Sequence, residues 1–430
     1  MPRRGRRLGE LTDRADLMIS RLKTVPGLLL GLMLLTPIAA WSQPEMLLPR
    51  TGLGPDELAV IINDSDPLSR QVGDYYRKAR GIPAANMIRL HFRPERSVLP
   101  KEEFEQLKRE IDRMTPAHVQ AYAVAWTQPY QVGCMSLTSA LAMGFDQRYC
   151  SVQCRPTAAS AYFNSPSLYP AMDHKLRPAM MLAGNSFGDV KALIDRGVAA
   201  DRSFPDGRAY LLNTPDKARS TRAAYFEQTA AELAGVFPIE VMEALAVVGR
   251  QDVLFYFTGL SQVPQLETLR FLPGALADHL TSFGGQLTDS SQMSSLRWLE
   301  AGATASYGTV VEPCNHPQKF PMPAVAMFFY ATGATAIEAY WKSVAWPGEG
   351  LFIGEPLARP FAPTLRELPN SVFELQLYSP REGTLHLEQA TSPSGPFRAL
   401  AQTRPIKRGA NLLRIALPPS MAGFVRPRWP

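Results

Sequence analysis

The chain has 430 residues, of which 46% are apolar and 20% charged, so its composition is that of a globular protein able to bury a large core. The first 42 residues hold seven Lys or Arg and three Asp or Glu; the remaining 38 basic and 36 acidic residues give a net charge of +2. This balance gives no indication of a nucleic-acid partner.

The N-terminus has the pattern of an export signal. A basic segment precedes the apolar run 25–40, and Ala40 and Ser42 occupy the small-residue positions of a cleavage site before Gln43. The run is short for a membrane span, which needs about 20 residues. We therefore predict a signal peptide over residues 1–42, with an uncleaved anchor as the alternative and Met18 as a second candidate start. The mature protein is expected to be periplasmic or extracellular, with no membrane span.

Four cysteines favour disulfides in an exported chain. They are Cys134, Cys150, Cys154 and Cys314, and three pairings are open. A structural zinc site is the less favoured alternative, because such sites usually have Cys-x-x-Cys pairs or regularly spaced His ligands. No phosphate loop, dinucleotide fingerprint or metal-binding helix is present, so no cofactor and no metal are predicted.

The first part of the chain alternates strands with helices. Apolar runs predict strands at residues 58–62, 87–90 and 121–126, and amphipathic patterns predict helices at 68–80 and 101–114. Pro67 suits a first helical turn and Gly81 suits a helix end. This alternation predicts a parallel sheet with right-handed crossovers.

Residues 128–167 break the alternation with Pro, Gly, Ser, aromatic residues and three of the four cysteines. A connection of this length is usually a functional surface or a disulfide-tied lid. If the sheet is parallel, this loop lies at the same edge as the loop that contains Cys314.

Periodicity then resumes. It predicts strands at residues 179–182, 209–212 and 253–257 and helices at 190–199, 218–233 and 272–280. The last of these helices contains Asp278 and His279, and we expect His279 to be a surface or capping residue of the helix rather than a catalytic one.

The stretch 287–356 is the part around which the chain is organised. A helix is predicted at residues 293–301 and a strand at 304–311, which ends in the segment Glu312-Pro313-Cys314-Asn315-His316. This places a carboxylate, a thiol, an amide and an imidazole at one sheet edge, and the carboxyl edge is where open α/β sheets bind ligands. A second helix follows at 335–344.

Beyond residue 360 the pattern changes to strands of period two, separated by Pro or Gly. We therefore predict a small β-sandwich-like module over residues 361–430, after an α/β domain over 43–360.

The order of elements resembles the caspase-like cysteine peptidases of the gingipain type. The resemblance rests on Gly81 and on the segments 253–259, 299–304 and 329–339. The stretches 177–182, 207–213, 284–314 and 340–356 look more closely like an uncharacterised family of exported bacterial proteins. The resemblance implies a mostly parallel sheet flanked by helices in a caspase-like arrangement.

The catalytic His–Cys dyad of these peptidases is missing from the corresponding positions of this chain. Thr258-Gly259 stands where a strand of those peptidases ends in His-Gly, and Asp289-Ser290 stands where the next strand ends in the nucleophilic Cys. A Cys–His mechanism needs a thiolate activated by an imidazole, and neither group is at its expected place.

Two other arrangements are open. Cys314 and His316 point the same way in an extended segment, and Glu312 can orient the imidazole as the third member of a triad. A disulfide at Cys314 removes that nucleophile, and we favour the disulfide. Ser290 lacks a visible base and is equally explained as a cap for the following helix.

We therefore predict a catalytically silent protein that binds peptides or envelope polymers. The alternatives are a hydrolase that uses Cys314 and His316, with Asp289 and Ser290 as further candidates, and a structural component of the cell envelope. The cleft is expected to be one pocket, covered by the disulfide-tied loop around residues 134–154. Its predicted lining residues are Thr258, Asp289, Ser290, Glu312, Asn315 and His316.

Overall fold

The computed structural model describes residues 44–418 and 420–430. The predicted signal peptide, its cleavage site and the alternative anchor lie outside these residues. In the described part, no helix is both long and apolar enough to cross a membrane.

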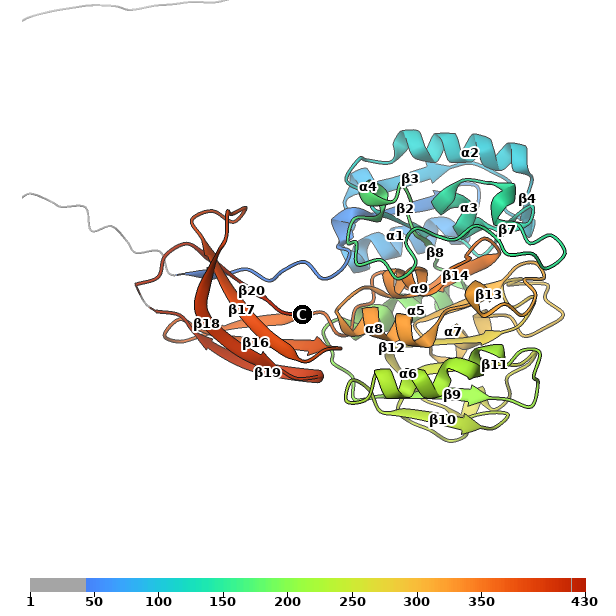
Figure 1. Cartoon of the computed structure of the whole chain (residues 1–430). Coiled ribbons are helices and arrows are strands. Elements are labelled where there is room, and N and C mark those ends of the chain that lie inside the picture. Colours follow the sequence, from blue (N-terminus) through green and yellow to red (C-terminus); the bar gives the residue numbers. More distant parts are fainter. Residues whose placement is uncertain (1–43, 419) are drawn as a thin grey trace, which may run out of the picture. The chain divides into compact units, whose positions relative to one another are not determined.

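A sheet of ten strands forms the centre of the α/β domain (Figure 1). In spatial order the strands are β10 (Ile239–Glu243), β9 (Arg208–Asn213), β11 (Val253–Gly259), β12 (Phe271–Leu280), β13 (Ala305–Thr309), β14 (Gly350–Gly354), β8 (Ala179–Met181), β5 (Ala121–Val124), β2 (Leu58–Asn63) and β3 (Met87–Leu90). Every neighbouring pair is parallel except β13 and β14, so the sheet consists of two parallel halves that run in opposite directions. The predicted α/β class with a mostly parallel sheet is confirmed.

Helices cover both faces of this sheet. They are α1 (Pro67–Arg80), α2 (Lys101–Met114), α3 (Leu137–Met143), α4 (Pro170–Asp173), α5 (Phe187–Ala200), α6 (Phe226–Glu232), α7 (Leu296–Ala301), α8 (Pro323–Ala331) and α9 (Ala336–Ser343). One core cluster joins apolar residues of α1, α5, α6, α8 and α9 to the sheet, and a second cluster joins those of α2, α3 and α7. Short 3-10 helices are η1 (Pro55–Glu57), η2 (Ala84–Asn86), η3 (Gln147–Tyr149), η4 (Thr221–Tyr225), η5 (Leu266–Thr268) and η6 (Pro317–Lys319).

Local signals account for the first strand–helix unit. All six residues of β2 are buried, as its continuous apolar run predicts. The carboxylate of Asp66 accepts a hydrogen bond from the Leu68 backbone at 2.8 Å and caps α1, which has Pro67 in its first turn. Gly81 ends the helix with a φ of 66°, a left-handed conformation that glycine adopts without steric cost.

The prediction of a helix at residues 272–280 is wrong. These residues belong to strand β12, in which Leu276, Asp278 and Leu280 share one face and His279 lies on the other, all buried. Leucines four residues apart in an Ala-rich segment imitate a helical stripe, but burial between two helical layers and pairing with β11 on one side override that propensity. His279 is therefore a core residue of a central strand and not a helix-surface residue.

A further set of strands occupies the C-terminal segment, as the period-two pattern predicts. They are β15 (Thr364–Leu368), β16 (Val372–Ser379), β17 (Gly383–Ala390), β18 (Arg398–Ile406), β19 (Gly409–Ala416) and β20 (Phe424–Arg428). They form a sheet of three strands and one of four, the latter completed by β1 (Glu45–Met46), and the two sheets share an apolar cluster. The assignment of residues 361–430 as a separate sandwich domain stays a prediction. A third small sheet contains β4 (Val98–Leu99), β6 (Gln131–Val132) and β7 (Met135–Ser136).

Candidate functional site

The carboxyl ends of β9 and β11 form a switch point of the half-sheet that contains β13. The connection after β9 packs through α6 on one face, whereas the connection after β11 packs on the other face. Open α/β sheets bind ligands at such points. Here residues 214–222 fill the crevice: Thr214 donates from its hydroxyl to the Gly259 carbonyl at 2.6 Å, and a Cβ at Gly259 would lie 1.9 Å from the Arg219 carbonyl oxygen.

A buried ion pair lies beneath this segment. Arg222 of η4 and Asp278 of β12 are 2% and 0% exposed, and the Arg222 Nη1 lies 2.7 Å from the Asp278 Oδ1. The guanidinium also donates to the backbone carbonyls of Thr258 (2.7 Å) and Pro321 (3.0 Å). Burial raises the pKa of Asp278 to about 6, and the charge of Arg222 opposes that rise. Arg222 thus connects η4, β11 and the chain before α8 at one point.

The imidazole of His279 is held in a single tautomer. The Trp298 indole N–H donates to its Nδ1 at 2.9 Å, so the ring proton is on Nε2, which lies 3.1 Å from the Met293 carbonyl oxygen. Burial lowers the pKa of His279 to about 3. Because both ring nitrogens are engaged and the ring is neutral, His279 is a structural residue and not an available base.

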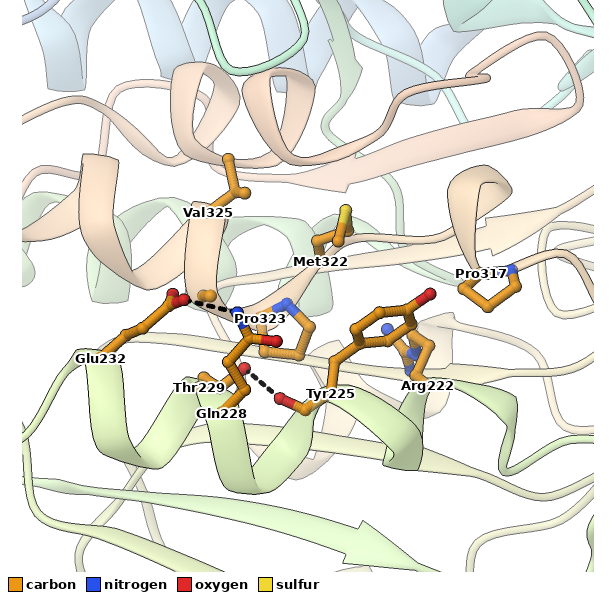
Figure 2. Close-up of a pocket in the computed structure, with 10 residues that line it drawn as sticks. Arg222, Tyr225, Gln228, Thr229, Glu232, Pro317, Met322, Pro323 and Val325 are labelled. Atoms are coloured by element: carbon orange, nitrogen blue, oxygen red, sulfur yellow. Dashed lines mark hydrogen bonds between the residues drawn. The ribbon is translucent and has the colours of Figure 1, made fainter.

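A cavity of about 280 Å³ opens between α6 and α8 (Figure 2). Its lining residues are Arg222, Tyr225, Gln228, Thr229, Glu232, Pro317, Met322, Pro323, Ala324 and Val325. Figure 2 shows Gln228 and Glu232 reaching up from α6 towards Val325 and Met322, with Tyr225 extending towards Pro317. The Gln228 amide donates to the Glu232 carboxylate at 2.7 Å, and the Thr229 hydroxyl donates to the Tyr225 carbonyl at 2.8 Å.

The loop after β13 contains Glu312, Cys314 and His316. The Glu312 carboxylate accepts from the Cys314 backbone at 2.8 Å, which turns the loop. Cys314 is bonded to Cys154, and the His316 Nε2 lies 2.9 Å from the Cys154 carbonyl oxygen. The His316 ring packs edge-on against Trp346, with 5.6 Å between the ring centroids. Asn315 is exposed beside them.

The other predicted residues lie elsewhere. β12 ends at Leu280, so Asp289 and Ser290 are not at a strand end but in the connection to α7. Exposed Asp289 accepts from the hydroxyls of Ser97 (2.9 Å) and Tyr130, and burial together with Asp289 raises the pKa of Tyr130 to about 12. The Ser290 hydroxyl donates to the Phe283 carbonyl at 2.8 Å.

Thr258 is buried at the end of β11 beside His279, with which it is paired in register. The cavity of Figure 2 is lined by none of the six residues predicted to form one pocket. A shared pocket of those six residues stays a prediction.

A second buried ion pair lies near the loop after β13. The Lys319 Nζ lies 3.1 Å from the Glu349 Oε1, and both side chains are fully buried. Burial lowers the pKa of Lys319 and raises that of Glu349, and in each case the partner's charge opposes the shift. The Ser151 backbone donates to the same carboxylate oxygen at 2.7 Å and so ties the long loop to this pair.

All four cysteines form disulfides, Cys134 with Cys150 and Cys154 with Cys314. The predicted disulfide-tied loop is therefore confirmed. The expectation that it leaves β5 at the same edge as the loop after β13 is wrong, because β5 and β13 belong to halves of the sheet that run in opposite directions. The loop reaches Cys314 because it is long. Within residues 44–418 and 420–430, no group of three His, Cys, Asp or Glu residues is arranged to hold a metal ion.

Sequence reasoning missed Arg222, Asp278 and the cavity beside them. An arginine in a predicted helix is normally exposed, so nothing local indicates that Arg222 is buried. The helix-like pattern of residues 272–280 conceals the position of Asp278 on the central strand β12. If residues 272–280 are read as a strand, the charged residue between apolar neighbours in Leu276-Ala277-Asp278-His279-Leu280 indicates a buried carboxylate that needs a partner.

Comparisons with known proteins identify no family. No family model matches the chain, and no curated protein matches it. A chain from the solved complex of the pro- and mature domains of RgpB from Porphyromonas gingivalis is similar with a TM-score of 0.43 and 9% identity, over 85% of this chain and 94% of that chain. A structure described as that of a protease has a TM-score of 0.37 and 11% identity, over 84% and 97%. The caspase-like arrangement therefore stays a proposal.

Proposed function

We propose that this chain is an exported, catalytically silent protein of caspase-like fold that binds a peptide in the cavity between α6 and α8. The observation that carries the proposal is the cavity itself, which opens beside the switch point of the half-sheet. The two disulfides fit an exported protein.

The size of the cavity favours one part of a longer chain. At about 280 Å³ it lies just below the range of about 300–1,000 Å³ in which pockets enclose whole small ligands. The cavity suits one or two side chains of a peptide. The backbone of that peptide then lies along the groove between α6 and α8. Its walls at Met322, Pro323 and Val325 are apolar, so burial of an apolar side chain there is favourable.

The polar atoms of the cavity suit a ligand that has both donors and acceptors. The Thr229 hydroxyl and one Gln228 amide hydrogen are engaged within the protein, which leaves the Glu232 carboxylate and the Gln228 carbonyl as acceptors and the second Gln228 amide hydrogen and the Tyr225 hydroxyl as donors. The charge of Arg222 is balanced by Asp278. A peptide supplies backbone N–H donors and carbonyl acceptors together with apolar side chains, and so matches the polar atoms and the apolar walls of the cavity.

Catalytic silence rests on the state of the candidate groups. Cys314 is in a disulfide and has no thiolate to attack a substrate. His316 lies against a backbone carbonyl, and His279 is buried with both nitrogens engaged. The disulfide counts against the hydrolase alternative with Cys314 and His316. The envelope-component alternative has no supporting contact among the described residues.

The proposal is tested by asking whether the protein retains peptides without cleaving them. The oxidised protein is immobilised and incubated with a library of short peptides and, separately, with purified cell-wall polymer, and retained and released material is analysed by mass spectrometry. We expect a subset of peptides to be retained intact. Thiol-dependent cleavage that disappears in Cys314→Ala would establish the hydrolase instead, and retention of polymer alone would exclude the peptide.

A further inference from the structure

The two disulfides differ in their surroundings. Cys134–Cys150 closes a loop of sequence separation 16, and Cys150 is 8% exposed within a core cluster. Cys154–Cys314 joins residues with a separation of 160, and Cys154 is exposed while Cys314 is half-buried. Cys134 is half-buried, so a dissolved or protein-borne thiolate has more access to Cys154 than to either cysteine of the other disulfide.

The exposed disulfide lies in a strained backbone. Gln153, Cys154 and Cys314 have φ angles of 52°, 60° and 57°, in the left-handed region that non-glycine residues seldom adopt. Such conformations persist only where the surroundings impose them. Residues 152–156 are all exposed, so little packing imposes them here. The restraints on Cys154 are the turn in which the Arg155 backbone donates to the Val152 carbonyl at 3.1 Å, the contact with His316 and the covalent bond to Cys314.

The bond also ties down the segment that leads into a wall of the cavity. Cys314 and His316 are followed directly by Pro317, which begins η6 and lines the cavity between α6 and α8. The contact of His316 with the Cys154 carbonyl joins the same two loops. Breaking the disulfide removes the covalent link between residues 312–316 and the long loop, whereas η6 stays held by the buried Lys319–Glu349 pair and by the Trp346 backbone, which donates to the Gln318 carbonyl at 2.9 Å.

We propose that Cys154–Cys314 is a site of reversible thiol–disulfide exchange with a protein dithiol. A thiolate of the partner attacks the exposed Cys154 sulfur, a mixed disulfide forms, and Cys314 leaves as a thiolate that takes up a proton. The partner's second thiol then attacks the mixed disulfide and releases Cys154. Two electrons pass from the partner dithiol, which becomes a disulfide, to the pair of cysteines, which become thiols.

This exchange has a consequence for the cavity, and that consequence rests on the proposed function. Release of Cys154 removes the covalent restraint on residues 312–316, which directly precede Pro317 in the cavity wall. The reduced protein is then expected to bind peptide more weakly than the oxidised protein. The exchange site itself stands independently of any ligand.

Limited reduction followed by alkylation tests the exchange site. The folded protein is treated with a protein dithiol of the thioredoxin class, quenched with an alkylating reagent at intervals and mapped by mass spectrometry. We expect Cys154 and Cys314 to be labelled at least tenfold faster than Cys134 and Cys150, which serve as the internal control. Equal rates, faster labelling of Cys134 and Cys150, or no labelling before unfolding would overturn the proposal.

Hydrogen exchange tests the effect on the loop. We expect amide exchange at residues 312–316 to accelerate at least tenfold in selectively reduced protein and in the double variant Cys154→Ser/Cys314→Ser. The double variant Cys134→Ser/Cys150→Ser is the control, and in it that segment should be unchanged. Unchanged exchange in reduced wild-type protein would show that the bond does not restrain the segment before the cavity wall. Peptide retention is measured separately. A protein that retains no peptide would count against the proposed function and not against the exchange site.

Discussion

Arg222→Met is expected to lower the free energy of unfolding at pH 7 by about 3–5 kcal/mol, because it leaves the buried carboxylate of Asp278 without its partner. The substitution also removes the donors to the carbonyls of Thr258 and Pro321. Burial already raises the pKa of Asp278 to about 6, and loss of the guanidinium raises it further. Below pH 6 the carboxyl is neutral in both proteins, so the penalty is expected to shrink as the pH falls. Denaturant unfolding at pH 7 and pH 5 measures both effects.

The matched control is Arg89→Met, which breaks an exposed pair. Arg89 contacts Asp64 and Asp74 at 2.6 and 2.8 Å with a side chain that is 42% exposed, so a cost of about 0–1 kcal/mol is expected. The double variant Arg222→Met/Asp278→Leu should recover much of the stability lost by Arg222→Met, since it leaves no unpaired charge. Similar costs for Arg222→Met and Arg89→Met would refute a stabilising role of the buried pair.

His279 is expected to make the fold sensitive to acid. Burial lowers its pKa to about 3, whereas an imidazole in the unfolded chain has a pKa of about 6.5. The unfolded state therefore binds a proton below pH 6.5 that the folded state does not bind, so the stability from this group is fully present above pH 6.5 and is lost as the pH falls towards 3. At pH 4 the loss is on the order of 3 kcal/mol.

Two measurements check this expectation. In an NMR titration the His279 ring should stay neutral down to about pH 4, as its pKa of about 3 implies. The variant His279→Asn removes the titrating group while the carboxyls remain, so its stability deficit relative to wild-type protein should decrease between pH 6.5 and pH 4. A ring that takes up a proton near pH 6.5 in the folded protein contradicts the account, whether or not the variant folds.

Local sequence signals predict most of the fold. The continuous apolar run of β2, Pro67 at the start of α1 and Gly81 at its end are features of the sequence itself, and the structure places them as predicted. The reversal of the sheet between β13 and β14 depends on pairing between segments about forty residues apart, for which neither strand has a sequence mark. The sequence gives no clear signal for strand β10, because this edge strand alternates apolar and charged residues and has no continuous apolar run.

The site was less predictable than the fold. Four cysteines together with a predicted export signal indicate disulfides, but the connectivity of these disulfides depends on where the long loop lies in space. Arg222 and Asp278 are distant in sequence, and both belong to residue types that are normally exposed. Their pairing can be predicted only if β12 is recognised as a strand. The cavity between α6 and α8 has no motif, because the packing of two helices creates it.

The most direct test of the account is a titration of a labelled peptide, chosen from those retained by the oxidised protein, against three forms of the chain. Ala324→Trp places a large side chain in the cavity, whereas Val198→Trp places the same side chain on the exposed face of α5. We expect at least tenfold weaker binding by Ala324→Trp and wild-type affinity for Val198→Trp. Equal affinity of all three forms would show that the peptide binds elsewhere and would contradict the assignment of this cavity as the binding site.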